Sequence, residues 1–277
     1  MSEDAGLEAF FAKAESREPL LRAALGFVPA PARPVFKAWT ALLAELRECA
    51  FELSDPRVTA LKAGWWAEEL DGMARGAARH PLGRALLARE LPRVPEAWAA
   101  ASEALVLVSA DADPAADRES AIAALLPLAA ALVAIESMLF GGAAGASSQG
   151  RALAVHWLRH RLERGLDAAD RARVPLALFA RHGLRREQLA SPGAAALRRD
   201  WARQLHSEAQ AFAPSSQYAW PYPRLLSLAA DRRALAMIAA GREPTQGPGQ
   251  SFLDVWRAWR LARNAALRPP RADTLPT

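Results

Sequence analysis

The sequence predicts an all-α protein, and three observations support that prediction. Hydrophobic side chains recur three or four residues apart over most of the 277 residues, which is the spacing of a helix with one apolar face. Val, Ile, Thr and Tyr are scarce, and no run of four or more residues alternates as a strand would. Because 52% of the residues are hydrophobic and 23% are charged, the chain can bury a full core, and we expect one domain.

The first half of the chain is expected to form helices at residues 6–14, 19–26, 35–53, 57–75, 81–90 and 94–108. The third of these has the clearest apolar face, which consists of Phe36, Trp39, Leu42, Leu43, Leu46, Ala50 and Leu53. Its charged residues fall elsewhere on the helix. The Asp-Ala-Asp-Pro sequence at 111–114 then breaks the chain.

Residues 121–146 carry a single charge, Glu136, over a length that could cross a bilayer. We expect a buried central helix instead of a membrane span. The stretch is mostly alanine, contains Pro127 and ends in Gly141 and Gly142 without aromatic or basic residues at both flanks. Its small side chains allow neighbouring helices to approach closely.

The second half is expected to form helices at 147–165, 175–182, 194–212, 224–240 and 250–264, with a turn rich in proline and aromatic residues at 213–223. In terms of organisation, we expect a helical domain over 1–240 and a connector at 241–249. A C-terminal helix at 250–264 and a tail at 265–277 complete the chain.

Charge and cysteine content narrow the classes of function. The net charge of +5 could attract nucleic acid or an anionic membrane, but only three residues are lysines and the arginines are spread among acids. We therefore expect no nucleic-acid partner, and at most a peripheral attraction to a membrane. The single cysteine excludes an internal disulfide, and no signal peptide precedes the polar N-terminus. These features favour a cytoplasmic protein, peripheral at most at the inner membrane.

The most distinctive motif is a pair of tryptophans, Trp65 and Trp66, in a helix that is followed by a His-Pro helix start at His80. A short turn with Gly76 lies between them. This order resembles the squalene/phytoene synthase family, whose members join a Trp-Trp helix to a His-Pro helix through a glycine-containing turn. The Ser-Asp-Pro sequence at 54–56 is similar to a turn in a divergent branch that includes a mitochondrial complex I assembly factor.

The resemblance implies an isoprenoid synthase-like helical bundle around a central cavity. Active members bind magnesium diphosphate through two Asp-x-x-x-Asp motifs, whose paired carboxylates share one helix face. The ion neutralises the leaving diphosphate and lets an allylic carbocation form. Neither motif is present here as written. We therefore expect no cofactor, or Mg²⁺ if the protein is active.

At the position of the first motif, Glu48 and Glu52 keep a spacing of four residues and are candidate metal ligands. The competing interpretation is a solvated helix face that Glu45, Glu48 and Glu52 form with Arg47. The longer side chain of glutamate also displaces the carboxylate, and Mg²⁺ tolerates poor octahedral geometry badly.

The second motif lies within residues 158–175 and allows two alignments. One keeps Arg161 and Arg171 as candidate substrate-binding residues but places leucines at the acidic positions. A shift by one residue instead brings Glu163 and Asp167 to a spacing of four residues, as candidate metal ligands. The sequence does not choose between the two alignments.

Other candidate residues carry weaker signals. His156 and His160 lie one helical turn apart, which suits a metal ion, but no third ligand is evident, and we expect them to be polar residues on a helix surface. Cys49 is expected to be a small buried residue. His80 is expected to cap or pack at a turn.

Three hypotheses for function follow. The first is a non-catalytic squalene/phytoene synthase-like protein, a pseudoenzyme that binds an isoprenoid, a lipid or a protein partner, because both aspartate pairs are lost. The second is a working Mg²⁺-dependent prenyltransferase that condenses two prenyl diphosphates with Glu48, Glu52, Glu163 and Asp167. The third is a structural or assembly protein with a filled core.

Overall fold

The computed structural model confirms the all-α prediction. It describes residues 3–53, 55–88, 94–110, 113–142, 146–164, 173–212, 220–243, 250–263 and 265, and among these it contains helices and no strand. Most of the predicted turn at 213–223, connector at 241–249 and tail at 265–277 lies outside these residues.

The helices of the first half are α1 (Glu3–Arg17), α2 (Leu20–Leu25), α3 (Arg33–Arg47), α4 (Pro56–Ala74), α5 (Pro81–Leu87) and α6 (Pro95–Ala110). A π-helical turn, η2 (Glu48–Glu52), continues α3. The helices of the second half are α7 (Arg118–Ala123), α8 (Leu126–Phe140), α9 (Ala146–Arg164), α11 (Leu176–His182), α12 (Ala195–Ala211), α13 (Tyr222–Ala239) and α14 (Gln250–Ala262). Short 3-10 turns lie at Ala30–Ala32, Arg186–Gln188 and Pro192–Ala194.

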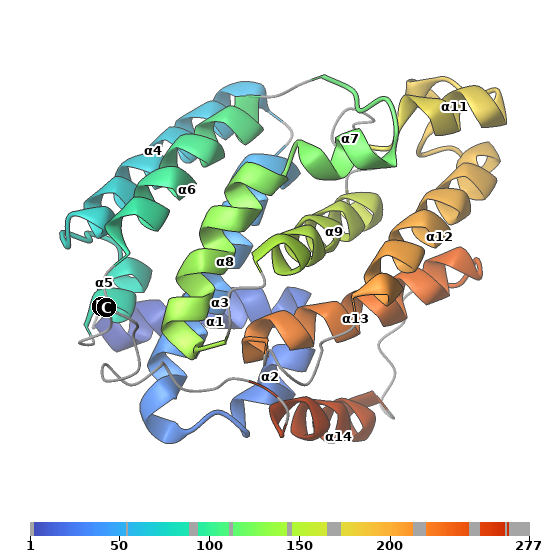
Figure 1. The fold of residues 1–277 in the computed structure, drawn as a ribbon. Coiled ribbons are helices and arrows are strands. Elements are labelled where there is room, and N and C mark those ends of the chain that lie inside the picture. Colours follow the sequence, from blue (N-terminus) through green and yellow to red (C-terminus); the bar gives the residue numbers. More distant parts are fainter. Residues whose placement is uncertain are drawn as a thin grey trace.

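Helices α4, α6, α8, α9, α13 and α12 pack one against the next in that order (Figure 1). Helix α3 packs against α1 and α5, and α14 lies at one end of the bundle against α2 and α13. Helix α9 therefore lies in the interior, in contact with α8, α12 and α13. Most polar side chains on α9 are therefore shielded from solvent.

The predicted central helix at 121–146 is wrong in one respect, because the chain forms two helices there, α7 and α8. Pro127 lies in the first turn of α8, where its missing N–H costs little and where a helix can begin. The predicted close approach of helices is confirmed between α8 and α9. A Cβ added at Gly150 of α9 would lie 3.7 Å from the backbone nitrogen of Ala130 of α8. Among the described residues, no helix combines the length and the apolarity that a bilayer crossing requires.

The one charge of that stretch, Glu136, is completely buried and joins three helices. Its carboxylate accepts hydrogen bonds from Nη2 of Arg224 at 2.8 Å and from Nε1 of Trp39 at 2.7 Å. A buried carboxylate needs such partners because the low-dielectric interior penalises an isolated charge. These two hydrogen bonds link α8 to α13 and to α3.

The tryptophan and His-Pro motif has a structural role. Buried Glu69 accepts hydrogen bonds from the backbone N–H groups of Arg79 and His80, at 2.9 and 2.8 Å. His80 is the N-cap of α5, because its Nδ1 accepts from the backbone N–H of Leu82, and its ring packs edge-on against Trp66. The prediction that His80 caps a turn is confirmed.

Candidate functional site

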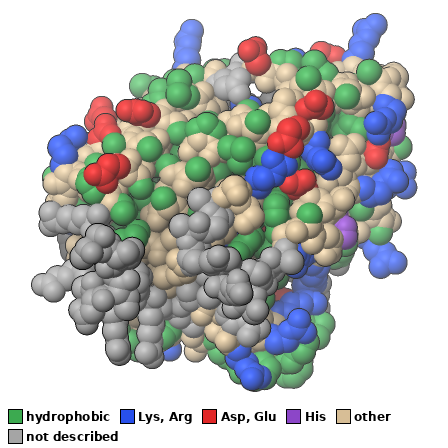
Figure 2. All heavy atoms as spheres, viewed as in Figure 1, with side chains coloured by type: hydrophobic (Ala, Val, Ile, Leu, Met, Phe, Trp, Pro, Cys, Tyr) green, Lys and Arg blue, Asp and Glu red, His purple; other side chains and the backbone are tan. Residues whose placement is uncertain are grey.

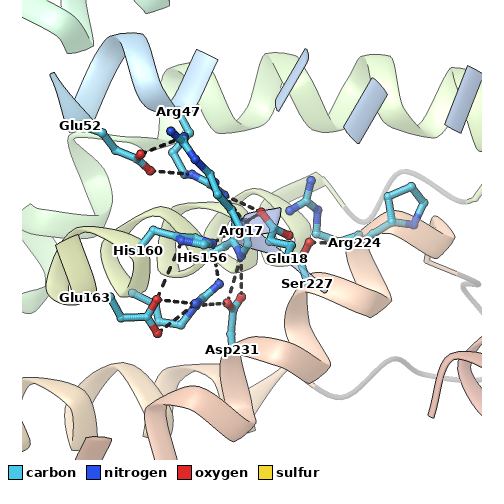
Figure 3. Close-up of polar contacts among 12 residues, drawn as sticks. Arg17, Glu18, Arg47, Glu52, His156, His160, Glu163, Arg224, Ser227 and Asp231 are labelled. Atoms are coloured by element: carbon cyan, nitrogen blue, oxygen red, sulfur yellow. Dashed lines mark hydrogen bonds and ion pairs between the residues drawn. The ribbon is translucent and has the colours of Figure 1, made fainter. Parts of the chain in front are cut away.

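The residues that the resemblance singles out lie where the ends of α1 and α3 meet α9 and α13. Figure 3 shows charged side chains from these helices pointing toward one another, and they include Arg17, Glu18, Arg47, Glu52, His156, His160, Glu163 and Asp231. We call these eight residues, with Glu48 and Arg159, the polar cluster.

Glu48, a predicted metal ligand, is held by three cations. Its carboxylate lies 2.7 Å from Nζ of Lys62, 2.9 Å from Nζ of Lys13 and 2.6 Å from Nη2 of Arg17. Burial opposes ionisation, but the hydrogen bonds from Lys62 and Lys13 outweigh it and lower the pKa of Glu48 to about 2. Glu48 is therefore an ionised and fully paired carboxylate.

Glu52, the second predicted ligand of this motif, is paired as well. It lies 3.1 Å from Nη1 of Arg17 and 2.9 Å from Nε of Arg47. One guanidinium, that of Arg17, therefore bridges both predicted ligands.

The alternative prediction of a solvated face is wrong. Glu45 and Arg47 are buried, and the side chains of Glu48 and Glu52 are largely covered. Residues from α1 and α4 cover this side of η2. The glutamates therefore contact cationic side chains instead of water.

The second predicted pair is only partly described. The carboxylate of Glu163 lies 2.8 Å from Nη1 of Arg159, whose Nε donates to Asp231 at 2.7 Å. Asp231 is completely buried on α13. Asp167 and Arg171 lie outside the described residues. Arg161 is buried, with its guanidinium 4.8 Å from the ring centroid of Phe51.

The prediction that His156 and His160 lie on a helix surface is wrong, because both are buried on α9. Nδ1 of His156 lies 3.0 Å from the carboxylate of Asp231. Nε2 of His156 and Nε2 of His160 lie 3.5 and 3.6 Å from the same oxygen of Glu18. Nε2 of His160 accepts from Nη2 of Arg159 at 2.5 Å. These partners come from α9, from α13 and from Glu18, which follows the end of α1.

The pKa values of the two histidines are shifted in opposite directions. Burial opposes protonation of His156, but Asp231 and Glu18 outweigh it and raise its pKa. Burial, Arg159 and Arg47 together hold the pKa of His160 well below its ordinary value. Burial also opposes ionisation of Glu18, yet His156 and Arg47 keep its pKa well below its ordinary range.

Glu18, His156 and His160 bring possible ligand atoms within 4.8 Å of one another. Glu18 is thus a third candidate ligand, which the sequence did not show. The donor set does not suit a metal as it stands. Both ring nitrogens of His156 already have partners, Asp231 at 3.0 Å and Nη1 of Arg47 at 3.3 Å, and Nε2 of His160 accepts from Arg159. Nη1 of Arg47 also lies 2.6 Å from Glu18, so a guanidinium supplies the positive charge.

Magnesium fits the described acidic positions no better. Mg²⁺ needs ionised oxygen ligands in near-octahedral geometry. Glu48, Glu52 and Glu163 offer carboxylate oxygens, but each carboxylate is already in contact with Arg or Lys side chains. A metal ion would have to displace these cations.

Sequence reasoning missed four residues of the polar cluster: Arg17, Glu18, Arg159 and Asp231. Arg159 and Glu163 are spaced for an i, i+4 ion pair, which was a readable signal. No local signal identified the others, because their partners lie far away in the chain.

Two solved structures show what the chain is similar to. The crystal structure of a dehydrosqualene synthase in complex with ligand matches with a TM-score of 0.67 at 12% sequence identity, covering 95% of this chain and 99% of that chain. This chain has the squalene/phytoene synthase fold. The squalene synthase HpnC from Alicyclobacillus acidocaldarius matches with a TM-score of 0.53 at 20% identity, covering 86% of this chain and 93% of that chain.

The likeness to these squalene synthase-like structures concerns the fold. The sequence matches no protein-family model and no curated protein sequence. Membership of the divergent branch with the complex I assembly factor therefore stays a prediction.

Proposed function

We propose that this squalene synthase-like protein does not ionise prenyl diphosphates and instead uses its helical bundle to bind an isoprenoid or a related lipid. The observation that carries the proposal is the pairing of Glu48, Glu52 and Glu163 with Arg17, Arg47 and Arg159. The fold is that of prenyltransferase-like proteins, so an apolar chain is the ligand class it favours.

The physical argument concerns the diphosphate leaving group. Magnesium held by free carboxylates neutralises that group while the carbon–oxygen bond breaks. Here arginine and lysine neutralise the carboxylates, which leaves the acidic positions without capacity for the ion. The alternative, an active Mg²⁺-dependent prenyltransferase, requires these ion pairs to open.

Pyrophosphate release from farnesyl and geranylgeranyl diphosphate with Mg²⁺ tests the proposal. We expect none from the wild type. The assay includes Glu163→Ala and Asp167→Ala, with Glu68→Ala on the exposed face of α4 as the matched control. Release that the first two variants abolish and Glu68→Ala retains would establish the prenyltransferase alternative.

Ligand binding is measured separately, by calorimetric titration of the protein with farnesol in the presence of EDTA. Binding without a divalent ion supports the proposal. Failure to bind farnesol or longer prenols would contradict the lipid-binding part and favour a protein partner.

A further inference from the structure

Helix α14 has one face that packs and one face that is exposed. Ala258 is completely buried against the bundle, and its carbonyl oxygen accepts a hydrogen bond from the hydroxyl of Tyr222 at 2.9 Å. On the other side, Phe252 is 76% exposed, and Trp256 and Trp259 are exposed as well. These three residues are spaced four and three apart, so they share one face of the helix.

An exposed face of this composition is unusual for a helix that packs on a core. Single exposed apolar residues are common, but adjacent large aromatic side chains mark a surface that contacts something else. Leu253 and Val255 are exposed on the same helix. At the end of the molecule where α14 lies, Figure 2 shows hydrophobic and basic side chains next to each other.

The basic side chains belong to the same helix face. The guanidinium of Arg260 lies 4.9 Å from the ring centroid of Trp256, and that of Arg263 lies 5.2 Å from that of Trp259. Asp254 is the one acid of α14, and it pairs with Arg233 and Arg257. Within the described part of the chain, neither Arg260 nor Arg263 has a carboxylate partner.

We propose that α14 docks on an anionic lipid bilayer. Tryptophan and phenylalanine favour the boundary between lipid headgroups and acyl chains, and arginines beside them attract lipid phosphates. A second copy of the chain is a poorer occupant, because a symmetric contact would bring Arg260 and Arg263 of both copies together. This inference does not depend on the proposed lipid ligand of the bundle.

Another exposed apolar surface offers a contrast. Leu61 on α4 and Leu107 on α6 are exposed, but they share their helix faces with the acidic residues Glu68 and Glu103. The acidic residues on that surface weaken its attraction to anionic lipid. Leu107→Ser is therefore a matched control, because it removes an exposed apolar side chain elsewhere on the molecule.

Co-sedimentation of the full chain with vesicles tests the proposal. We expect binding to vesicles that contain one third phosphatidylglycerol, weak binding to pure phosphatidylcholine, and loss of binding at high salt. Arg260→Gln with Arg263→Gln should weaken the partition by roughly thirty-fold. Trp256→Ser with Trp259→Ser should abolish it, and Leu107→Ser should bind as the wild type does.

Two outcomes would overturn the proposal. The first is that the wild type binds vesicles with and without phosphatidylglycerol equally well, or binds neither kind. The second is a dimer in sedimentation velocity that the Trp256→Ser, Trp259→Ser protein does not form, which would make a second copy the occupant. The pyrophosphate assay is independent of both readouts, so failure here leaves the proposed function untouched.

Discussion

Nη2 of Arg17 lies 2.6 Å from Oε2 of Glu48, at the end of α3 where the sequence resemblance predicts a metal ligand. The same guanidinium reaches Glu52, the next acidic position. Because Arg17 belongs to α1 and the two glutamates to η2, the side chain also fixes how these elements meet. A structural cation therefore lies where a catalytic cation would be expected.

Replacing Arg17 by methionine should lower the free energy of unfolding by roughly 1.5–3 kcal/mol, because it removes an ion pair with Glu48 and a hydrogen bond to Glu52. Urea denaturation followed by circular dichroism measures the change. Arg22→Ala is the matched control, since its ion pair with Glu15 is exposed and should change stability by less than about 0.5 kcal/mol. Equal effects of the two variants would contradict a structural role for Arg17.

A second prediction concerns Arg47, whose side chain is nearly inaccessible and contacts both Glu18 and Glu52. Arg47→Met should destabilise the protein by roughly 3–5 kcal/mol, because it leaves buried carboxylates without their cation. In the double variant with Glu52→Gln, the loss should be smaller than the sum of the single losses.

The same double-mutant cycle on the exposed pair Arg79 and Glu68 serves as the control for Arg47. Its coupling energy should be below about 0.5 kcal/mol. A coupling energy for Arg47 and Glu52 no larger than this would show that burial does not strengthen the pair.

The sequence was sufficient for the fold because helix formation leaves a local pattern. The apolar spacing from Phe36 to Leu46 predicted α3, and His80 before Pro81 predicted a cap at a turn, which the structure confirms. The break before α8 was also present, as Pro127, but the apolar composition of the stretch hid it.

The site was harder to predict because its contacts are distant in sequence. His156 meets Asp231 across 75 residues and Arg47 across 109. Charged side chains at helical spacing have the same pattern whether water or another charge covers them, so the sequence left both a metal ligand and a solvated face open for Glu48. Only the cations that α1 and α4 place against Glu48 distinguish the two cases.

The two histidines of the polar cluster should titrate on opposite sides of their ordinary pKa of 6.5. The raised pKa of His156 stabilises the fold below pH 6.5, and this contribution is lost as the pH rises through that raised value. The lowered pKa of His160 destabilises the fold as the pH falls below 6.5, because the unfolded chain takes up the proton first. NMR spectra of the imidazole nitrogens at pH 6.5 should show a protonated His156 and a neutral His160.

The variants His156→Gln and His160→Gln assign these signals, because each variant should remove the imidazole signals of the replaced histidine. Two buried histidines that titrate together near 6.5 would contradict the arrangement.

The ion pairs of Glu48 should make the free energy of unfolding depend on pH in the acidic range. Its pKa falls from an ordinary 4.5 to about 2 in the folded protein, so its contribution is complete above pH 4.5 and is lost as the pH falls toward 2. Glu48→Gln should be less stable than the wild type at pH 7, and the difference should shrink across this range. Denaturation at several pH values measures it. A difference that does not change with pH would show that Glu48 is not ionised in the folded protein.

The last prediction concerns Gly83, which lets α5 approach the buried carboxylate of Glu69. A Cβ at this position would lie 2.7 Å from Oε1 of Glu69 and 2.9 Å from Cβ of Ala78, closer than such atoms pack. Gly83→Ala should therefore destabilise the protein by roughly 1–3 kcal/mol, although alanine is the better helix former. Gly64→Ala on α4 is the control, because a Cβ there meets nothing within 4 Å and should stabilise the helix by up to about 1 kcal/mol. Thermal unfolding of both variants decides between steric conflict and helix propensity, since propensity alone would stabilise both.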